Sequence, residues 1–176
     1  MRVAGFDLKL WFAQGFGIGR IPVAPGTFGS VLGVLWFAIL AALGNLWWFS
    51  LGLIAGFFLS VWLCGEGEKI LKKKDPGSIV LDEITAMPLC FLPWALIQTS
   101  RSGAWPATDF FFGDGHWKWI LAIFAAFRFF DVLKPWPVKQ SQRLPGGWGV
   151  TVDDFLAAGY VAIASLAVWW IAQRLG

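Results

Sequence analysis

Residues 46–64 read LWWFSLGLIAGFFLSVWLC, a run without a single charged side chain. An α-helix needs about 20 predominantly apolar residues to cross the hydrocarbon core of a bilayer, and this run approaches that length. Residues 155–172 form a second run of similar length and character. We therefore predict that both segments form membrane-spanning helices.

Three further apolar stretches, residues 28–44, 84–98 and 117–130, extend this pattern. The last two are short for a span, and Pro88 and Pro93 interrupt residues 84–98, where each removes a helical hydrogen bond. We expect these two stretches to be tilted, re-entrant or interfacial. The sequence therefore predicts an all-α fold, a polytopic membrane helical bundle of about four to five apolar helices in a single domain.

Composition supports a membrane protein. Hydrophobic residues make up 57% of the 176 residues, charged residues make up 14%, and the mean hydropathy is +0.65. A soluble domain of this size cannot bury so much apolar surface. The net charge of +3 does not indicate a nucleic-acid partner, because no recognition helix, zinc-binding spacing or aromatic RNA motif accompanies it. Cys64 and Cys90 lie in apolar surroundings and predict neither a disulfide framework nor a metal-binding pair.

Lysine and arginine are distributed unevenly between the two sides that the spans define. If each stretch crosses once, only Arg101, Lys118 and Arg174 fall on one side, and the other basic residues lie on or near the opposite side. Cytoplasmic loops carry the excess of lysine and arginine, so we expect the basic side to be cytoplasmic. The loops on that side are residues 15–28, 66–83 and 131–154.

Five acidic residues on the cytoplasmic side form three groups, each at the edge of an apolar stretch. They are Asp82, Glu83, Asp131, Asp153 and Asp154. Carboxylates that converge on one point repel one another unless a divalent cation neutralises them, and hard oxygen ligands suit Mg²⁺. We therefore expect these five residues to form a magnesium site.

Each group also has a simpler explanation. Asp153–Asp154 could cap the final helix, where a carboxylate meets free N–H groups and the positive end of the dipole. Asp82–Glu83 could be a solvated helix start, and Asp131 could pair with Arg128 or Lys134, three residues away on the same helical face. No group indicates a site by itself, but all three on one side of the membrane favour one.

Arg128, Asp131 and Lys134 form a stripe at helical spacing, and Pro135 ends the helix immediately afterwards. The carboxylate at the centre could hold a metal ion. The basic ends could bind phosphate oxygens, arginine by bidentate contact and lysine as a point charge. We take these three as the candidate catalytic residues, and the two basic ones also as phosphate ligands.

The first cytoplasmic loop contains APGTFGS, residues 24–30, and leads into an apolar helix. Glycines let the backbone approach a ligand, and a helix N-terminus with hydroxyl groups nearby offers donors to an anion. The candidates for substrate binding in this loop are Gly26, Thr27, Gly29 and Ser30. A second glycine-rich segment, residues 146–149, could position the final acidic pair or be only a turn.

The sequence lacks the residues that other phosphatase mechanisms require. Neither cysteine is followed by an arginine loop, the lone His116 falls on the side opposite the acidic groups, and no Asp-x-Asp-x-Thr pattern exists. The remaining mechanism is attack by water with the assistance of a metal ion.

Four segments occur in an order that resembles one known family. They read PGTFGS at 25–30, GSIVLDE at 77–83, FRFFDVLKPWP at 127–137 and GGWGVTVDD at 146–154. Together they resemble phosphatidylglycerophosphatase A, a bacterial inner-membrane enzyme of phosphatidylglycerol synthesis. The resemblance implies a largely helical fold and Mg²⁺-dependent removal of the terminal phosphate of phosphatidylglycerophosphate, with the active site on the cytoplasmic face.

Two positions depart from the pattern expected of that family. Ala86 and Gln142 stand where a glycine and an acid are expected. Gln142 therefore drops out as a metal ligand, and the helix after Asp82 and Glu83 is expected to pack somewhat differently.

Three alternatives stay open. A small transporter or channel subunit would place ionisable groups near the bilayer midplane, whereas these acids lie at the edges of spans. A structural bundle could associate through Gly52-x-x-x-Gly56, but packing within one chain explains that motif equally well, so the oligomeric state is open. A phosphatase for another lipid phosphate would use the same residues.

Overall fold

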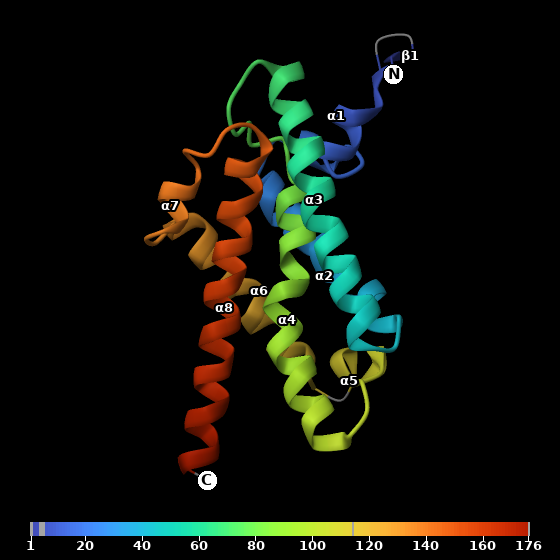
Figure 1. The fold of residues 1–176 in the computed structure, drawn as a ribbon, viewed down its shortest axis with the longest axis vertical. Helices are drawn as coiled ribbons and strands as arrows, with labels where there is room; N and C mark the ends of the chain where they lie inside the picture. The colour runs from blue at the N-terminus through green and yellow to red at the C-terminus, as the bar shows by residue number, and fades with distance from the viewer. Residues whose placement is uncertain (1, 4–5, 114, 176) are drawn as a thin grey trace.

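The computed structural model describes residues 2–3, 6–113 and 115–175 (Figure 1). A short antiparallel pair of strands opens the chain, and helices make up most of the rest. The elements in order are β1 Arg2–Val3, β2 Phe6–Asp7, α1 Leu8–Ala13, the 3-10 helix η1 Ile18–Arg20, α2 Pro25–Ala42, α3 Leu46–Leu71, α4 Leu81–Ser102, α5 Thr108–Phe112, α6 Trp117–Leu133, α7 Val138–Ser141 and α8 Gly147–Leu175.

The predicted helical bundle is confirmed, but fewer helices than predicted have the length and hydropathy of a span. Within the described residues these are three, α2, α3 and α8. α4 has 22 residues, but acidic residues in its first turn and polar residues in its last turn lower its hydropathy. α6 is shorter, with 17 residues. The two stretches judged short from the sequence are therefore the ones that do not qualify.

α4 lies at the centre of the bundle and packs against α2, α3 and α8 (Figure 1). Pro88 and Pro93 are buried inside this helix, which continues past both. Its Phe91 stacks on Phe37 of α2 with ring centroids 4.2 Å apart, and Phe111 meets Phe37 edge-on. These fully buried rings anchor α4 against its neighbours, because large aromatic side chains contribute most to core packing.

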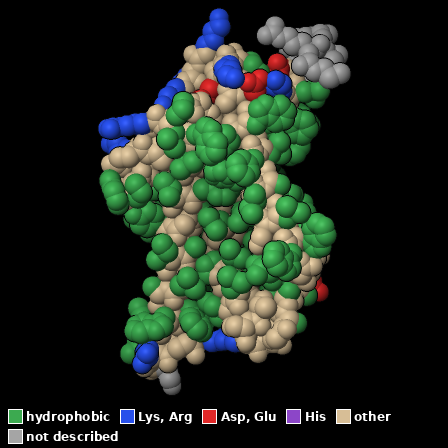
Figure 2. All heavy atoms as spheres, viewed as in Figure 1, with side chains coloured by type: hydrophobic (Ala, Val, Ile, Leu, Met, Phe, Trp, Pro, Cys, Tyr) green, Lys and Arg blue, Asp and Glu red, His purple; other side chains and the backbone are tan. Residues whose placement is uncertain are grey.

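The outer surface of the bundle is strongly apolar. Figure 2 shows hydrophobic side chains over the middle of the molecule and most of the charged side chains near one end. On α3, Trp47 is 87% exposed, and Ile54, Phe58 and Trp62 are each more than half exposed. A soluble monomer rarely exposes so large an apolar surface, whereas a bilayer covers it without cost.

α8 begins in close backbone contact with α3, and this contact determines where the first turns of α8 lie. A Cβ atom built on Gly147 would lie 1.9 Å from the carbonyl oxygen of Val61 and 2.6 Å from the backbone nitrogen of Gly65. Only glycine fits against a neighbouring backbone at that distance. The first turns of α8 are thereby held beside α3 and α4.

Candidate metal and phosphate site

All five acidic residues predicted to form the metal site line one pocket of about 200 Å³. The pocket collects Asp82 and Glu83 from α4, Asp131 from α6, and Asp153 and Asp154 from α8. Asp82, Glu83 and Asp154 each offer one carboxylate oxygen, and these three oxygens all lie within 4.8 Å of one another. The structure therefore brings together residues that are up to 72 positions apart in the chain, from Asp82 to Asp154.

The acidic pair on α8 does not cap a helix. α8 starts at Gly147, so Asp153 and Asp154 lie in its second turn, where they are only 2% and 4% exposed. The capping explanation for this pair is wrong, because the helix already begins at Gly147, within the glycine-rich segment. Asp82, in the first turn of α4, is likewise buried rather than solvated.

Several oxygens in the pocket lack a partner among the described residues. Glu83 Oε2, Asp153 Oδ1 and Asp154 Oδ2 are buried and accept no hydrogen bond there. A buried carboxylate without a partner costs several kcal/mol unless it is neutralised or coordinates a metal ion. Closely spaced, hard and unpartnered oxygen donors fit a divalent cation such as Mg²⁺.

The acidic groups of α4 show the electrostatic strain of this arrangement. Burial raises the pKa of the Asp82 carboxyl well above its usual range, and the charge of Glu83 adds to the rise. Burial also raises the pKa of Glu83 to about 7, although Arg128 opposes the shift. A bound cation would lower both values, because it favours the ionised carboxylates.

Arg128 ties three helices together at the pocket. Its Nη1 atom lies 2.9 Å from Oδ2 of Asp131 and 3.8 Å from Oε1 of Glu83. The same nitrogen donates to the hydroxyl of Ser30 at 3.2 Å. Ser30 in turn donates to the carbonyl of Gly26 at 2.9 Å. Ser30 is fully buried, so its contacts orient Arg128.

The predicted phosphate loop forms the start of α2, and its glycines allow close approach to α4. A Cβ atom on Gly26 would lie 2.3 Å from Oε1 of Glu83, and one on Gly29 would lie 2.8 Å from Cβ of Val80. Thr27 is half-buried in the first turn of α2, and no hydrogen bond joins its hydroxyl to a described carboxylate.

Lys134 joins α6 to α8. It ends α6 with a left-handed backbone, and its Nζ atom contacts Oδ2 of Asp153 and lies 3.8 Å from Oδ1 of Asp131. Burial alone would lower the pKa of the ammonium group, but the carboxylate of Asp153 outweighs it and the pKa rises above its usual value. Lys134 therefore stays positively charged.

Comparison with known proteins decides the family. The model of the family described as "Phosphatidylglycerophosphatase A" matches residues 11–169. The chain belongs to the phosphatidylglycerophosphatase A family. This confirms the resemblance carried by the four sequence segments.

Individual relatives agree with this assignment. The phosphatidylglycerophosphatase A of Haemophilus influenzae is 37% identical over 161 residues, which cover 90% of this chain and 88% of the relative. That of Escherichia coli is 34% identical over 147 residues, covering 82% and 74%. A Bacteroides thetaiotaomicron protein, provisionally named a phosphatidylinositol-3-phosphatase, is 32% identical over 171 residues, covering 93% and 95%. No solved structure is significantly similar to the chain.

In this member of the phosphatidylglycerophosphatase A family, Gln142 has a contact that sequence reasoning missed. Its Nε2 atom donates to Oδ2 of Asp153 at 2.9 Å and to Oδ2 of Asp75 at 3.3 Å. Asp75 also lines the carboxylate pocket. Its place in the Asp75-Pro76-Gly77 turn, just before the acidic pair of α4, was the one sequence signal for it. The assignment of metal and phosphate ligands among these side chains stays a prediction.

Proposed function

We propose that this chain hydrolyses the terminal phosphomonoester of phosphatidylglycerophosphate in phospholipid biosynthesis, releasing phosphatidylglycerol and phosphate, with Mg²⁺ as its cofactor. Membership of the phosphatidylglycerophosphatase A family supports the reaction. One structural observation carries the cofactor proposal. Three carboxylates from α4 and α8 offer oxygens within 4.8 Å of one another.

Asp82, Glu83 and Asp154 would hold the metal ion, with Asp131 and Asp153 beside them in the same pocket. When bound, the ion supplies positive charge at the transferring phosphoryl group and lowers the pKa of water. The buried oxygens of Glu83 and Asp154 support this assignment, because these two atoms otherwise have no hydrogen-bond partner among the described residues.

Arg128 and Lys134 would bind the phosphomonoester. Asp131 and Ser30 fix one nitrogen of the Arg128 guanidinium, which leaves its other N–H groups to donate to phosphate oxygens. Lys134 would add a second positive charge from the end of α6. Groups already oriented in this way stabilise charge in the transition state without having to rearrange. Thr27 would complete the phosphate cradle from the start of α2.

We further propose that the chain crosses the bacterial inner membrane several times as one domain, with the pocket at the cytoplasmic face. α2, α3 and α8 are the candidate spans. Lys72, Lys73 and Lys74 follow α3 and precede the pocket-lining residues of α4, and such lysine-rich loops are typical of the cytoplasmic side. The headgroup would then reach the pocket while the acyl chains stay in the bilayer.

A lipid inositol phosphate is the second candidate substrate, because the Bacteroides relative carries that kind of name across 93% of this chain. The test is phosphate release by the purified full-length protein in detergent micelles that contain either lipid phosphate, with Mg²⁺ and then with a chelator. We expect turnover of phosphatidylglycerophosphate that stops with the chelator. Preference for the inositol lipid would show that this lipid, rather than phosphatidylglycerophosphate, is the substrate. Undiminished turnover with the chelator would contradict the proposal that Mg²⁺ is the cofactor.

A further inference from the structure

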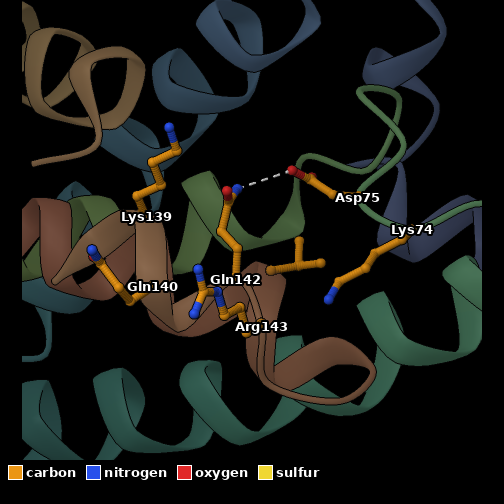
Figure 3. A pocket seen from close by; sticks show the side chains of 8 residues that line it. Lys74, Asp75, Lys139, Gln140, Gln142 and Arg143 are labelled. Atoms are coloured by element: carbon orange, nitrogen blue, oxygen red, sulfur yellow. Dashed lines mark hydrogen bonds between the residues drawn. The ribbon is translucent and has the colours of Figure 1, made fainter. Parts of the chain in front are cut away.

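A second and larger pocket, of about 670 Å³, adjoins the carboxylate pocket. It is lined by Lys74, Asp75, Lys139, Gln140, Gln142, Arg143, Gly149 and Val150. Figure 3 shows Lys74 reaching in from the loop after α3, while Lys139, Gln140 and Arg143 belong to α7 and the turn that follows. Elements from three parts of the chain therefore form its wall.

This pocket is rich in unpaired positive charge. Lys74, Lys139 and Arg143 are exposed, and none of them forms an ion pair with another described residue. Its one acid, Asp75, accepts a hydrogen bond from Gln142. Three cations against one carboxylate make the pocket electropositive, and arginine with lysine is the combination that binds phosphate groups.

The two pockets share one lining residue. Asp75 lines both of them. Gln142 lines the larger pocket, and Figure 3 shows its amide directed at Asp75. The same amide donates to Asp153 in the carboxylate pocket at 2.9 Å. A ligand with two anionic groups a short distance apart could therefore reach both pockets at once.

The larger pocket lies near the level at which α3 changes from apolar to charged residues. Gly149 and Val150 line it, and α8 begins two residues earlier against Val61 and Gly65 of α3. The charged residues of α3 begin at Glu66, directly after this contact. That level, where an apolar helix becomes charged, is where lipid headgroups lie. The position favours an anion carried by a lipid over one dissolved in water.

We propose that this cationic pocket binds the phosphodiester of the lipid substrate while the carboxylate pocket holds its phosphomonoester. This inference rests on the proposed function. In phosphatidylglycerophosphate one glycerol unit separates the two phosphates, which suits two adjoining pockets. Lys74, Lys139 and Arg143 are then specificity-determining residues, because a lipid phosphomonoester without the second phosphate gains nothing from them.

The test compares the Lys139→Ala/Arg143→Ala variant with wild type in mixed micelles of a neutral detergent. Two inhibitors probe the pockets separately: phosphatidylglycerol carries only the phosphodiester, and inorganic phosphate resembles only the released group. We expect KM for phosphatidylglycerophosphate and Ki for phosphatidylglycerol to rise about tenfold. We expect kcat and Ki for inorganic phosphate to change by less than about twofold.

Lys72→Ala/Lys73→Ala is the control, because it also removes two positive charges, from the loop next to Lys74, and neither residue lines the pocket. We expect the KM of this control to match wild type. An equal rise in KM in the control would assign the effect to general surface charge and overturn the proposal. A rise in Ki for inorganic phosphate alone would assign the pocket to free phosphate and also overturn it. Unchanged KM with normal turnover refutes only this pocket, whereas no turnover by wild type refutes the proposed function itself.

Discussion

Nη1 of Arg128 lies 2.9 Å from Oδ2 of Asp131, one turn further along α6. The two residues form a partly buried ion pair at the edge of the carboxylate pocket, with side chains 21% and 12% exposed. The spacing of three residues between them in the sequence already indicated that this contact was possible. It also predicts that each partner affects the site through the other.

Asp131→Asn should lower phosphate release at least about 100-fold, because it removes a negative charge from the proposed metal site and loosens Arg128. Asparagine keeps the size of the side chain, so membrane insertion and the gel-filtration profile in detergent should match wild type. Activity is measured as phosphate release from phosphatidylglycerophosphate. Near-normal turnover would remove Asp131 from the catalytic set.

Arg128→Lys should lower kcat/KM about 10- to 100-fold, since lysine keeps the charge but cannot donate to Ser30, Asp131 and a phosphate at once. Arg101→Lys is the matched control, because Arg101 lies in the last turn of α4, at the opposite end from the acidic pair. Steady-state kinetics on both variants decide the matter. Equal kinetics in the two would show that only positive charge matters at Arg128.

Gly26→Ala should raise the Mg²⁺ concentration needed for half-maximal activity about tenfold or more. The added Cβ would lie 2.3 Å from Oε1 of Glu83, so that carboxylate must leave its present position. Gly159→Ala serves as the control, because nothing lies within 4 Å of a Cβ at that position. An unchanged Mg²⁺ requirement in Gly26→Ala would separate Glu83 from the metal site.

Gly147→Ala should destabilise the protein by about 1–3 kcal/mol or more, because the new Cβ meets the backbone of α3 rather than a movable side chain. Thermal unfolding in detergent measures the change, again with Gly159→Ala for comparison. If the unfolding temperature of Gly147→Ala equals that of wild type, α8 does not need this close contact with α3.

In chelator, the free energy of unfolding should fall as pH rises from 4.5 to 7. The folded-state pKa of Glu83 is raised from 4.5 to about 7, so the folded protein binds the proton more tightly than the unfolded chain. The stabilisation from this proton is fully present below the unfolded-state pKa of 4.5, and it is lost as the pH rises through the folded-state pKa of about 7. Thermal unfolding across this range measures it. Mg²⁺ should reduce the loss, and a loss that Mg²⁺ leaves unchanged would argue against a cation beside Glu83.

Much of this architecture was readable from residue patterns. The charge-free run 46–64 predicted α3, and the position of acidic groups at the edges of apolar stretches predicted which carboxylates would meet. The start of α8 was missed, because residues 146–149 have the composition of a turn. Gly147 begins the helix there because only a glycine fits against Val61, a contact between distant segments that no local pattern reveals.

The contacts of Gln142 escaped prediction for a related reason. A glutamine is not a carboxylate ligand of the expected kind, so we predicted no role for it. Its amide reaches Asp153 only because α7 folds back beside the first turns of α8. Contacts between segments that fold back on each other in this way cannot be predicted from local sequence patterns.

Binding of a divalent cation by the pocket is the most direct test of the account. Isothermal titration of the purified full-length protein with Mg²⁺, paired with phosphate release at each Mg²⁺ concentration, should show binding and activity rising together in wild type. Asp154→Asn should lose both, because it removes one of the three clustered carboxylates. Binding and Mg²⁺-dependent turnover that persist in Asp154→Asn at wild-type levels would contradict the proposed centre.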